Sequence, residues 1–316
     1  MGMKGKGKPP MNLRKALNVA ILGAGLAGIM TSGCSRDHIE AVNLANEGDR
    51  SVKVNVEGAI QKYEQARQLD PSNHRILYKL AHAYKKKEDW EKMASVLAQA
   101  TQQAPEFANY WFERGYSLIK QAQAGNPDMY EEAKAPFQEC IKYDPNFSEC
   151  YHFLGEAMEW TDDNQGAIEN YTKALQHDPM TAYFYPAPAS LYITYKMYDQ
   201  AEAVLKEGTR MIPPTEATQN NLYEMYILMF QVSQAKNDQA GMLAAMESAQ
   251  AVAGDAHPEI AFNLGSTYAV MDPPQKEKAV RMLKSFTKRA CASAKGMKFK
   301  EQCAAAQSLL QELGGG

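Results

Sequence analysis

Apolar residues recur at intervals of three and four along most of the chain, and polar turns interrupt them at regular places. The stretch 144–179 shows the pattern most clearly. Its apolar positions are Tyr151, Leu154, Gly155 and Met158 in a first series, and Ala167, Tyr171 and Ala174 in a second. This spacing predicts two amphipathic helices joined by the turn TDDNQ, and not strands. The closing Asp-Pro ends the second helix, because proline disfavours the helical conformation of the residue before it.

The same unit recurs along the chain. Its closing prolines are Pro71, Pro105, Pro145, Pro179 and Pro213, separated by 34, 40, 34 and 34 residues. The longer interval carries an insertion in the turn AGNPDMY. A period of about 34 residues with two helices in each unit resembles the tetratricopeptide repeat family. The resemblance implies an all-α fold, a right-handed helical solenoid of helix-turn-helix repeats with a C-terminal capping helix.

The regularity of the pattern divides the chain into five predicted segments. They are a basic and apolar leader over 1–33, an atypical N-terminal helix over 34–50, regular repeats over 51–214, degenerate repeats over 215–290, and a capping helix with a frayed tail over 291–316. Atypical terminal repeats are expected because each end of a solenoid must cap the stack. The methionine-rich stretch after Pro214, with Met225, Met229, Met242 and Met246, is expected to pack in the core, and a pliable binding groove is the alternative.

The leader resembles a bacterial lipoprotein signal peptide. It has five basic residues and no acid, then the short apolar run NVAILGAGLAGIM, then Thr31-Ser32-Gly33 before Cys34. The apolar run is short for a transmembrane helix. The resemblance implies cleavage before Cys34 and acylation of Cys34, as with palmitate, and Ser35 after it implies the outer membrane with the protein on the periplasmic side. Translation from either Met1 or Met11 fits this interpretation.

The leader also contains a glycine motif that resembles one found in a different class of protein. Gly23, Gly25 and Gly28 follow an apolar run in the order that resembles the dinucleotide-binding fingerprint of flavoproteins and dehydrogenases. That chemistry requires a strand, a helix and a second strand that ends in an acidic residue about 20 residues further on. The chain continues instead into helical repeats, so we expect no bound cofactor. An FAD- or NAD-binding enzyme remains an alternative, as does a cytoplasmic repeat adaptor with an uncleaved anchor.

The net charge of the chain argues against one class of partner. The formal net charge is −3, but without residues 1–33 the chain has 29 basic and 37 acidic residues, a net of −8. An acidic body argues against nucleic acid as a partner, because phosphate backbones recruit basic surfaces.

The cysteines other than Cys34 form two local pairs. Cys140 and Cys150 lie on consecutive predicted helices, and so do Cys291 and Cys303. We predict a disulfide within each pair, which an oxidising periplasm permits. Buried free thiols are the alternative.

No spacing typical of a catalytic or metal site occurs. There is no H-E-x-x-H, G-x-S-x-G or Walker loop, and acidic pairs such as Asp162-Asp163 fall in turns. The resemblance instead implies a concave groove formed by the first helix of each repeat. The positions predicted to line it are Arg75, Tyr78, His82 and Lys85, then Asn109, Phe112, Tyr116 and Ile119, then Glu149, His152, Glu156 and Glu159, then Tyr183 and Ile193.

The groove composition favours recognition of a peptide. Family members that clamp a C-terminal carboxylate use lysine where Tyr78, Phe112 and His152 stand here, so we do not expect that mode. Aromatic residues and arginine are enriched at binding hot spots. The sequence therefore predicts a non-catalytic, membrane-anchored interaction scaffold that binds a protein or peptide segment, acting as an assembly factor or adaptor for an envelope complex.

Overall fold

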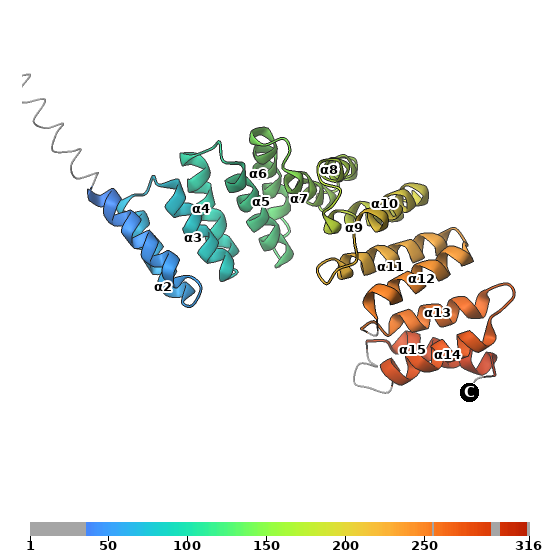
Figure 1. Cartoon of the computed structure of the whole chain (residues 1–316). Helices are drawn as coiled ribbons and strands as arrows, with labels where there is room; N and C mark the ends of the chain where they lie inside the picture. Colours follow the sequence, from blue (N-terminus) through green and yellow to red (C-terminus); the bar gives the residue numbers. More distant parts are fainter. Residues whose placement is uncertain (1–35, 255, 292–297, 315–316) are drawn as a thin grey trace, which may run out of the picture. The chain divides into compact units, whose positions relative to one another are not determined.

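The described part of the chain is helical. A computed structural model describes residues 36–254, 256–291 and 298–314, and these contain helices and turns but no strand (Figure 1). The all-α fold class is thereby confirmed. The leader, Cys34 and the glycine motif Gly23, Gly25 and Gly28 lie outside the described residues.

Contacts divide the chain into two compact units, Met1–Met129 and Tyr130–Gly316. The first unit contains a helix over residues 36–51, then α2 (Val56–Leu69), α3 (His74–Lys86), α4 (Trp90–Gln103) and α5 (Ala108–Gln123). Ala41 and Ala45 of the first helix are buried with Ala59 and Tyr63 of α2 in one core. The expected N-terminal helix therefore exists, and it packs against the repeats that follow it.

The second unit begins with α6 and continues to the C-terminus. Its elements are α6 (Met129–Tyr143), α7 (Ser148–Glu159), α8 (Asn164–His177), the 3₁₀ turn η1 (Ala182–Phe184), α9 (Pro186–Thr194), α10 (Tyr198–Met211), α11 (Gln219–Ala235), α12 (Gln239–Ala253), α13 (Glu259–Val270), α14 (Lys276–Phe286), the π-helical η2 (Thr287–Cys291) and α15 (Lys300–Glu312). Consecutive helices α11 to α14 lie side by side (Figure 1). The chain therefore keeps its helix-pair pattern where the sequence repeat loosens.

Small residues allow the two helices of a pair to approach closely. A Cβ atom on Gly155 of α7 would lie 2.8 Å from Cδ1 of Tyr171 and 3.2 Å from the carbonyl oxygen of Ala167, both on α8. The same relation joins Gly265 of α13 to Leu283 of α14, at 2.7 Å from its Cγ. Protein interiors are close-packed, so this space exists only because glycine leaves it.

The turns within pairs use a common device. Glu88, Asp162 and Asn237 have φ angles of 56°, 62° and 55°, in the left-handed region. The aspartate that follows each one accepts a hydrogen bond from a backbone N–H in the first turn of the second helix; these are Asp89, Asp163 and Asp238. Such caps satisfy donors that a helix end leaves free. The acidic pair Asp162-Asp163 therefore has a structural role.

The turns between pairs are closed by an aromatic side chain. Trp111 Nε1 donates to the Pro105 carbonyl at 2.7 Å, Tyr151 Oη donates to the Pro145 carbonyl at 3.1 Å, and Tyr185 Oη donates to the Pro179 carbonyl at 2.8 Å. In each case the donor lies six residues after the proline. The aromatic at this position thus fixes the connection into the next first helix.

The predicted capping helix is present as α15. Phe299, Ala306 and Leu310 are buried against Leu283 and Phe286 of α14. The Met-rich stretch also packs as expected in part, since Met225 and Met246 are fully buried, whereas Met229 and Met242 are half-buried.

We predict that Gly155→Ala destabilises the protein by about 1–2 kcal/mol, because overpacking exceeds the gain of about 1 kcal/mol in helix propensity. Urea unfolding followed by circular dichroism measures the change. Gly58→Ala in α2 is the matched control. A Cβ there would meet only the side chain of Asn55, which caps α2 and would have to shift. The weakened cap offsets the gain in helix propensity, so we expect a change within about 0.5 kcal/mol. Equal effects of the two substitutions would contradict the close-approach argument.

Candidate functional site

One side of α3 carries four of the predicted groove residues. Arg75, Tyr78, His82 and Lys85 are spaced by three, four and three residues, so they lie along one side of the helix. Side chains of α5, the next first helix, contact this side of α3. We call the surface formed by these residues of α3 and by Asn109, Tyr110, Phe112 and Tyr116 of α5 the first-helix face.

Aromatic rings join α3 to α5 on this face. The Tyr78 ring lies 4.4 Å from the His82 ring and 4.7 Å from the Tyr110 ring, between centroids. His74 Nδ1 lies 2.8 Å from the Tyr110 hydroxyl, and the Phe107 ring stacks on Tyr110 at 5.1 Å. Tyr78 is therefore a half-buried centre of an aromatic row rather than an isolated surface residue.

A buried ion pair lies at the end of this row. Lys85 Nζ donates to both carboxylate oxygens of Glu113, each at 2.9 Å, and Glu113 is only 7% exposed. Sequence reasoning missed Glu113. The available signal was its place eight residues after Pro105, because Lys79, eight residues after Pro71, likewise pairs with Asp49 of the preceding helices. In these two units the position carries a charge that bonds to an earlier helix, whereas Phe153 and Ala187 occupy it in the next two.

The ion pair and the burial set the charge state of the face. Burial lowers the pKa of His82. The charge of Glu113 opposes this shift, and the charge of Lys85 adds to it. Its Nε2 is buried without a hydrogen bond, 4.0 Å from Oε1 of Glu113. Burial, together with the Glu113 charge, raises the pKa of Tyr78 to about 12. The face thus offers neutral rings beside a fixed ion pair.

The remaining predicted positions of the first unit differ in exposure. Arg75 and Asn109 are exposed, and Phe112 and Tyr116 are half-buried with ring centroids 6.1 Å apart. Lys85 Nζ also lies 4.9 Å from the centre of the Tyr116 ring. Ile119 is fully buried, so it packs in the core and does not line a groove.

In the second unit His152 is the clearest departure from expectation. It is 6% exposed, and its ring lies within 5.4 Å of the rings of Phe153, Tyr171, Tyr183 and Phe184. The cause is the 3₁₀ turn η1, which brings Tyr183 and Phe184 over it. Its Nδ1 has no hydrogen-bond partner, and burial lowers its pKa to about 4. His152 therefore belongs to an aromatic core rather than to an open binding surface.

The other predicted groove residues of the second unit remain accessible. Glu149 is half-buried and accepts a hydrogen bond from Ser148 Oγ at 3.0 Å. Glu156, Glu159 and Ile193 are half-buried, and Tyr183 is 40% exposed. Glu159 accepts a hydrogen bond from the Tyr171 hydroxyl at 2.7 Å, and this bond fixes the orientation of the Glu159 side chain.

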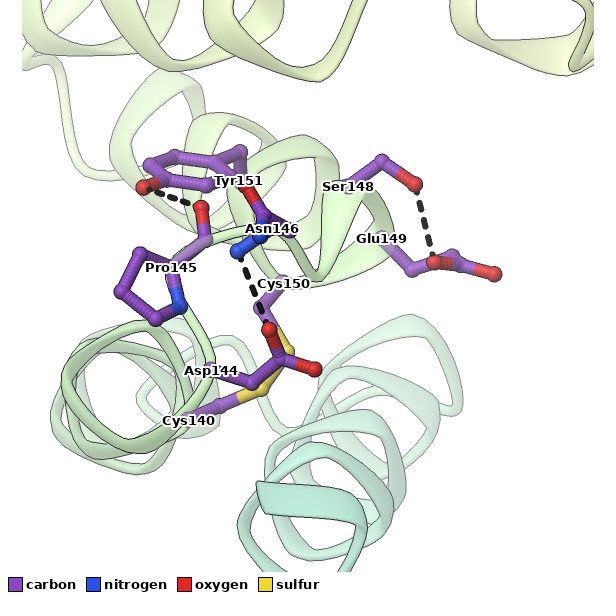
Figure 2. The surroundings of a disulfide bond; sticks show 8 residues. All are labelled: Cys140, Asp144, Pro145, Asn146, Ser148, Glu149, Cys150 and Tyr151. Carbon is purple, nitrogen blue, oxygen red and sulfur yellow. Dashed lines mark hydrogen bonds between the residues drawn. A yellow bond between two sulfur atoms is a disulfide. The ribbon is translucent and has the colours of Figure 1, made fainter. Parts of the chain in front are cut away.

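The structure brings each predicted cysteine pair together as a disulfide. Cys140 of α6 bonds to Cys150 of α7, with both residues fully buried, and Figure 2 shows this bond beside the Tyr151–Pro145 hydrogen bond. Cys291 at the end of η2 bonds to Cys303 of α15. Each bond joins consecutive helices, so the two disulfides fasten a repeat junction and the capping helix.

Metal-binding clusters and membrane-spanning helices are both absent from the described residues. Within them, no group of three or more His, Cys, Asp or Glu residues is placed to hold a metal ion. None of the helices in that part of the chain is long and apolar enough to cross a membrane.

Comparisons with known proteins agree with this architecture. The family model described as TPR repeat matches residues 55–88, which contain α2 and α3. The C-terminal part of a TPR repeat-containing protein from Cytophaga hutchinsonii is 14% identical with a TM-score of 0.63, over 80% of this chain and 98% of that one.

Two further solved structures share the fold. Pseudomonas aeruginosa PilF is 15% identical with a TM-score of 0.53, over 74% of this chain and 99% of that one. PilW, described as a widely conserved type IV pilus biogenesis factor, is 14% identical with a TM-score of 0.51, over 72% and 97%. Identities this low show a common fold, and they leave the partner to be argued from the site.

The Lys85–Glu113 pair yields a test of the first-helix face. We expect Lys85→Met to lower the free energy of unfolding by about 1–2 kcal/mol, because a buried carboxylate loses its cation while solvent screens the partly exposed lysine. The double variant Lys85→Met/Glu113→Leu should recover most of the loss. Lys86→Met, at an exposed neighbouring lysine without an ion pair, is the control. Equal unfolding curves for all four proteins would show that the pair contributes nothing.

His152 predicts a pH dependence. Its folded pKa of about 4 lies below the ordinary 6.5, so the unfolded chain binds the proton first as pH falls. The stability contribution is complete above pH 6.5 and is lost as pH falls toward 4. We expect His152→Phe to remove about 2 kcal/mol of the stability difference between pH 8 and pH 5, measured by urea unfolding. An unchanged difference would contradict the buried neutral histidine.

Proposed function

We propose that this chain, a tetratricopeptide-repeat protein in fold and in its matched repeat, is a non-catalytic scaffold that binds a segment of a partner protein on its first-helix face. The observation that carries the proposal is the face itself. Tyr78, Phe112 and Tyr116 present rings that are only half-buried, and Arg75 and Asn109 beside them are exposed. Aromatic residues and arginine dominate the energy of protein interfaces.

The arrangement suits an extended or helical peptide. The rings of Tyr78 and Tyr110 are held by neighbouring rings, and Lys85 is held by Glu113, so little side-chain freedom remains to be lost on binding. Preorganisation of this kind raises affinity because less conformational entropy is lost. Arg75 then supplies a charge at the edge, where rim charges govern association rate and specificity.

We further propose that the scaffold works in the bacterial envelope, anchored through an acylated Cys34. The resemblance of residues 1–34 to a lipoprotein signal peptide supports this, and so do the two disulfides, which persist in oxidising compartments. The shared fold with PilW, a pilus biogenesis factor by its description, supports an assembly role by analogy of architecture. More than one acyl chain provides a stable anchor.

Photo-cross-linking in the host tests the scaffold function. A photoreactive amino acid placed at Arg75 or Asn109 should capture the same partner protein, because both exposed positions flank the aromatic row. The same amino acid at Ser95, an exposed position on the second helix α4, is the matched control and should give no such adduct.

The variant Tyr78→Ala, combined with the reactive position at Asn109, should reduce adduct yield several-fold because it removes the central ring. Adducts that form equally from Ser95, or that are unaffected by Tyr78→Ala, would contradict binding on this face.

A further inference from the structure

A second surface of this kind lies on α11, where the sequence repeat is degenerate, and its residues have the same spacing as those on α3. Asn220, Tyr223 and Ile227 of α11 are spaced by three and four, as Arg75, Tyr78 and His82 are on α3. Together with Glu224 and His257 they line an open surface pocket of about 510 Å³, which we call the Tyr223 pocket. Sequence reasoning placed no groove residue here, because the series of closing prolines stops at Pro213.

The aromatic wall of the Tyr223 pocket is fixed in place. The ring of Tyr223 stacks on the ring of His257, with centroids 3.9 Å apart. Glu259 accepts hydrogen bonds at one carboxylate oxygen from both, at 3.2 Å from the tyrosine hydroxyl and 3.1 Å from His257 Nδ1. Both rings are therefore preorganised before any ligand arrives.

Glu224 supplies the charge of the pocket. Glu224 is an exposed residue, and its carboxylate takes part in none of the hydrogen bonds and ion pairs found among the described residues. Partial burial raises its pKa. A nearby opposite charge favours the ionised carboxylate, so an incoming positive charge would be attracted there. An anionic ligand would instead meet the charges of Glu224 and Glu259 together.

We infer that the Tyr223 pocket binds the side chain of an arginine or lysine in a partner protein, with its charge against Glu224 and its methylene groups along Tyr223 and Ile227. Long cationic side chains commonly bury their stems on apolar surface while the charged head is paired. Asn220 offers an amide oxygen as a second acceptor. The inference rests on the proposed scaffold function and specifies the kind of residue that the partner must present.

A short peptide tests the pocket in the full-length chain. The probe is acetyl-Gly-Arg-Gly-amide, and its neutral counterpart has citrulline in place of arginine. Isoleucine δ-methyl labelling provides the readout, because Ile227 lines the pocket whereas Ile76 lies in the core of the first unit. We expect the arginine peptide to shift the Ile227 methyl signal and the citrulline peptide to leave it in place.

Glu224→Gln should weaken that binding about threefold, as loss of a solvent-exposed charged partner predicts. Glu277→Gln, at an exposed carboxylate on α14, is the matched control and should bind as the parent does. Equal shifts with citrulline, no shift of Ile227, or unchanged binding by Glu224→Gln would each overturn the inference. Cross-links from Arg75 and Asn109 would still stand in that case, so failure here is distinct from failure of the scaffold function.

Discussion

The close approach of two helices at a glycine is the constraint on which the repeat depends. Gly155 leaves room for the Tyr171 ring, Gly208 for the Tyr185 ring and Gly265 for Leu283. Each large side chain fills the space that a glycine leaves, and the core continues from one pair to the next, as from Ala41 to Tyr110. A side chain at any of these glycines would push the helices apart, and interiors this dense have little capacity to relax.

Other positions of the first helices do not pack in these cores and are available for binding. In the first unit they hold the aromatic row and the Lys85–Glu113 pair, and in the second they hold the Tyr223 pocket with Glu224. The two surfaces differ in charge, since one carries the exposed Arg75 and the other the exposed carboxylate of Glu224. We propose that the two faces distinguish partner segments by the charges that the segments present.

The sequence was sufficient for the features that depend on local spacing. Residues such as Leu154 and Ala167 repeat with helical periodicity, and cysteines that fall on consecutive helices are close because the turn between them is short. It was insufficient where a side chain's surroundings come from another repeat. The burial of His152 depends on η1 in the following repeat, and that of Glu113 on Lys85 in the preceding one. The His152 contact has no fixed sequence spacing that could have revealed it. The place of Glu113 eight residues after Pro105 indicated a charged position, but it did not identify Lys85 as the partner.

The envelope role depends on where the protein resides, and the intact mass of the chain extracted from the membranes of its own host tests this most directly. The account predicts a chain that begins at Cys34 and carries added acyl mass, which would place the repeats outside the cytoplasm and remove Gly23, Gly25 and Gly28 from the mature protein. A chain that retains residues 11–33 without lipid would contradict the envelope scaffold. It would favour an uncleaved anchor or the dinucleotide-binding alternative.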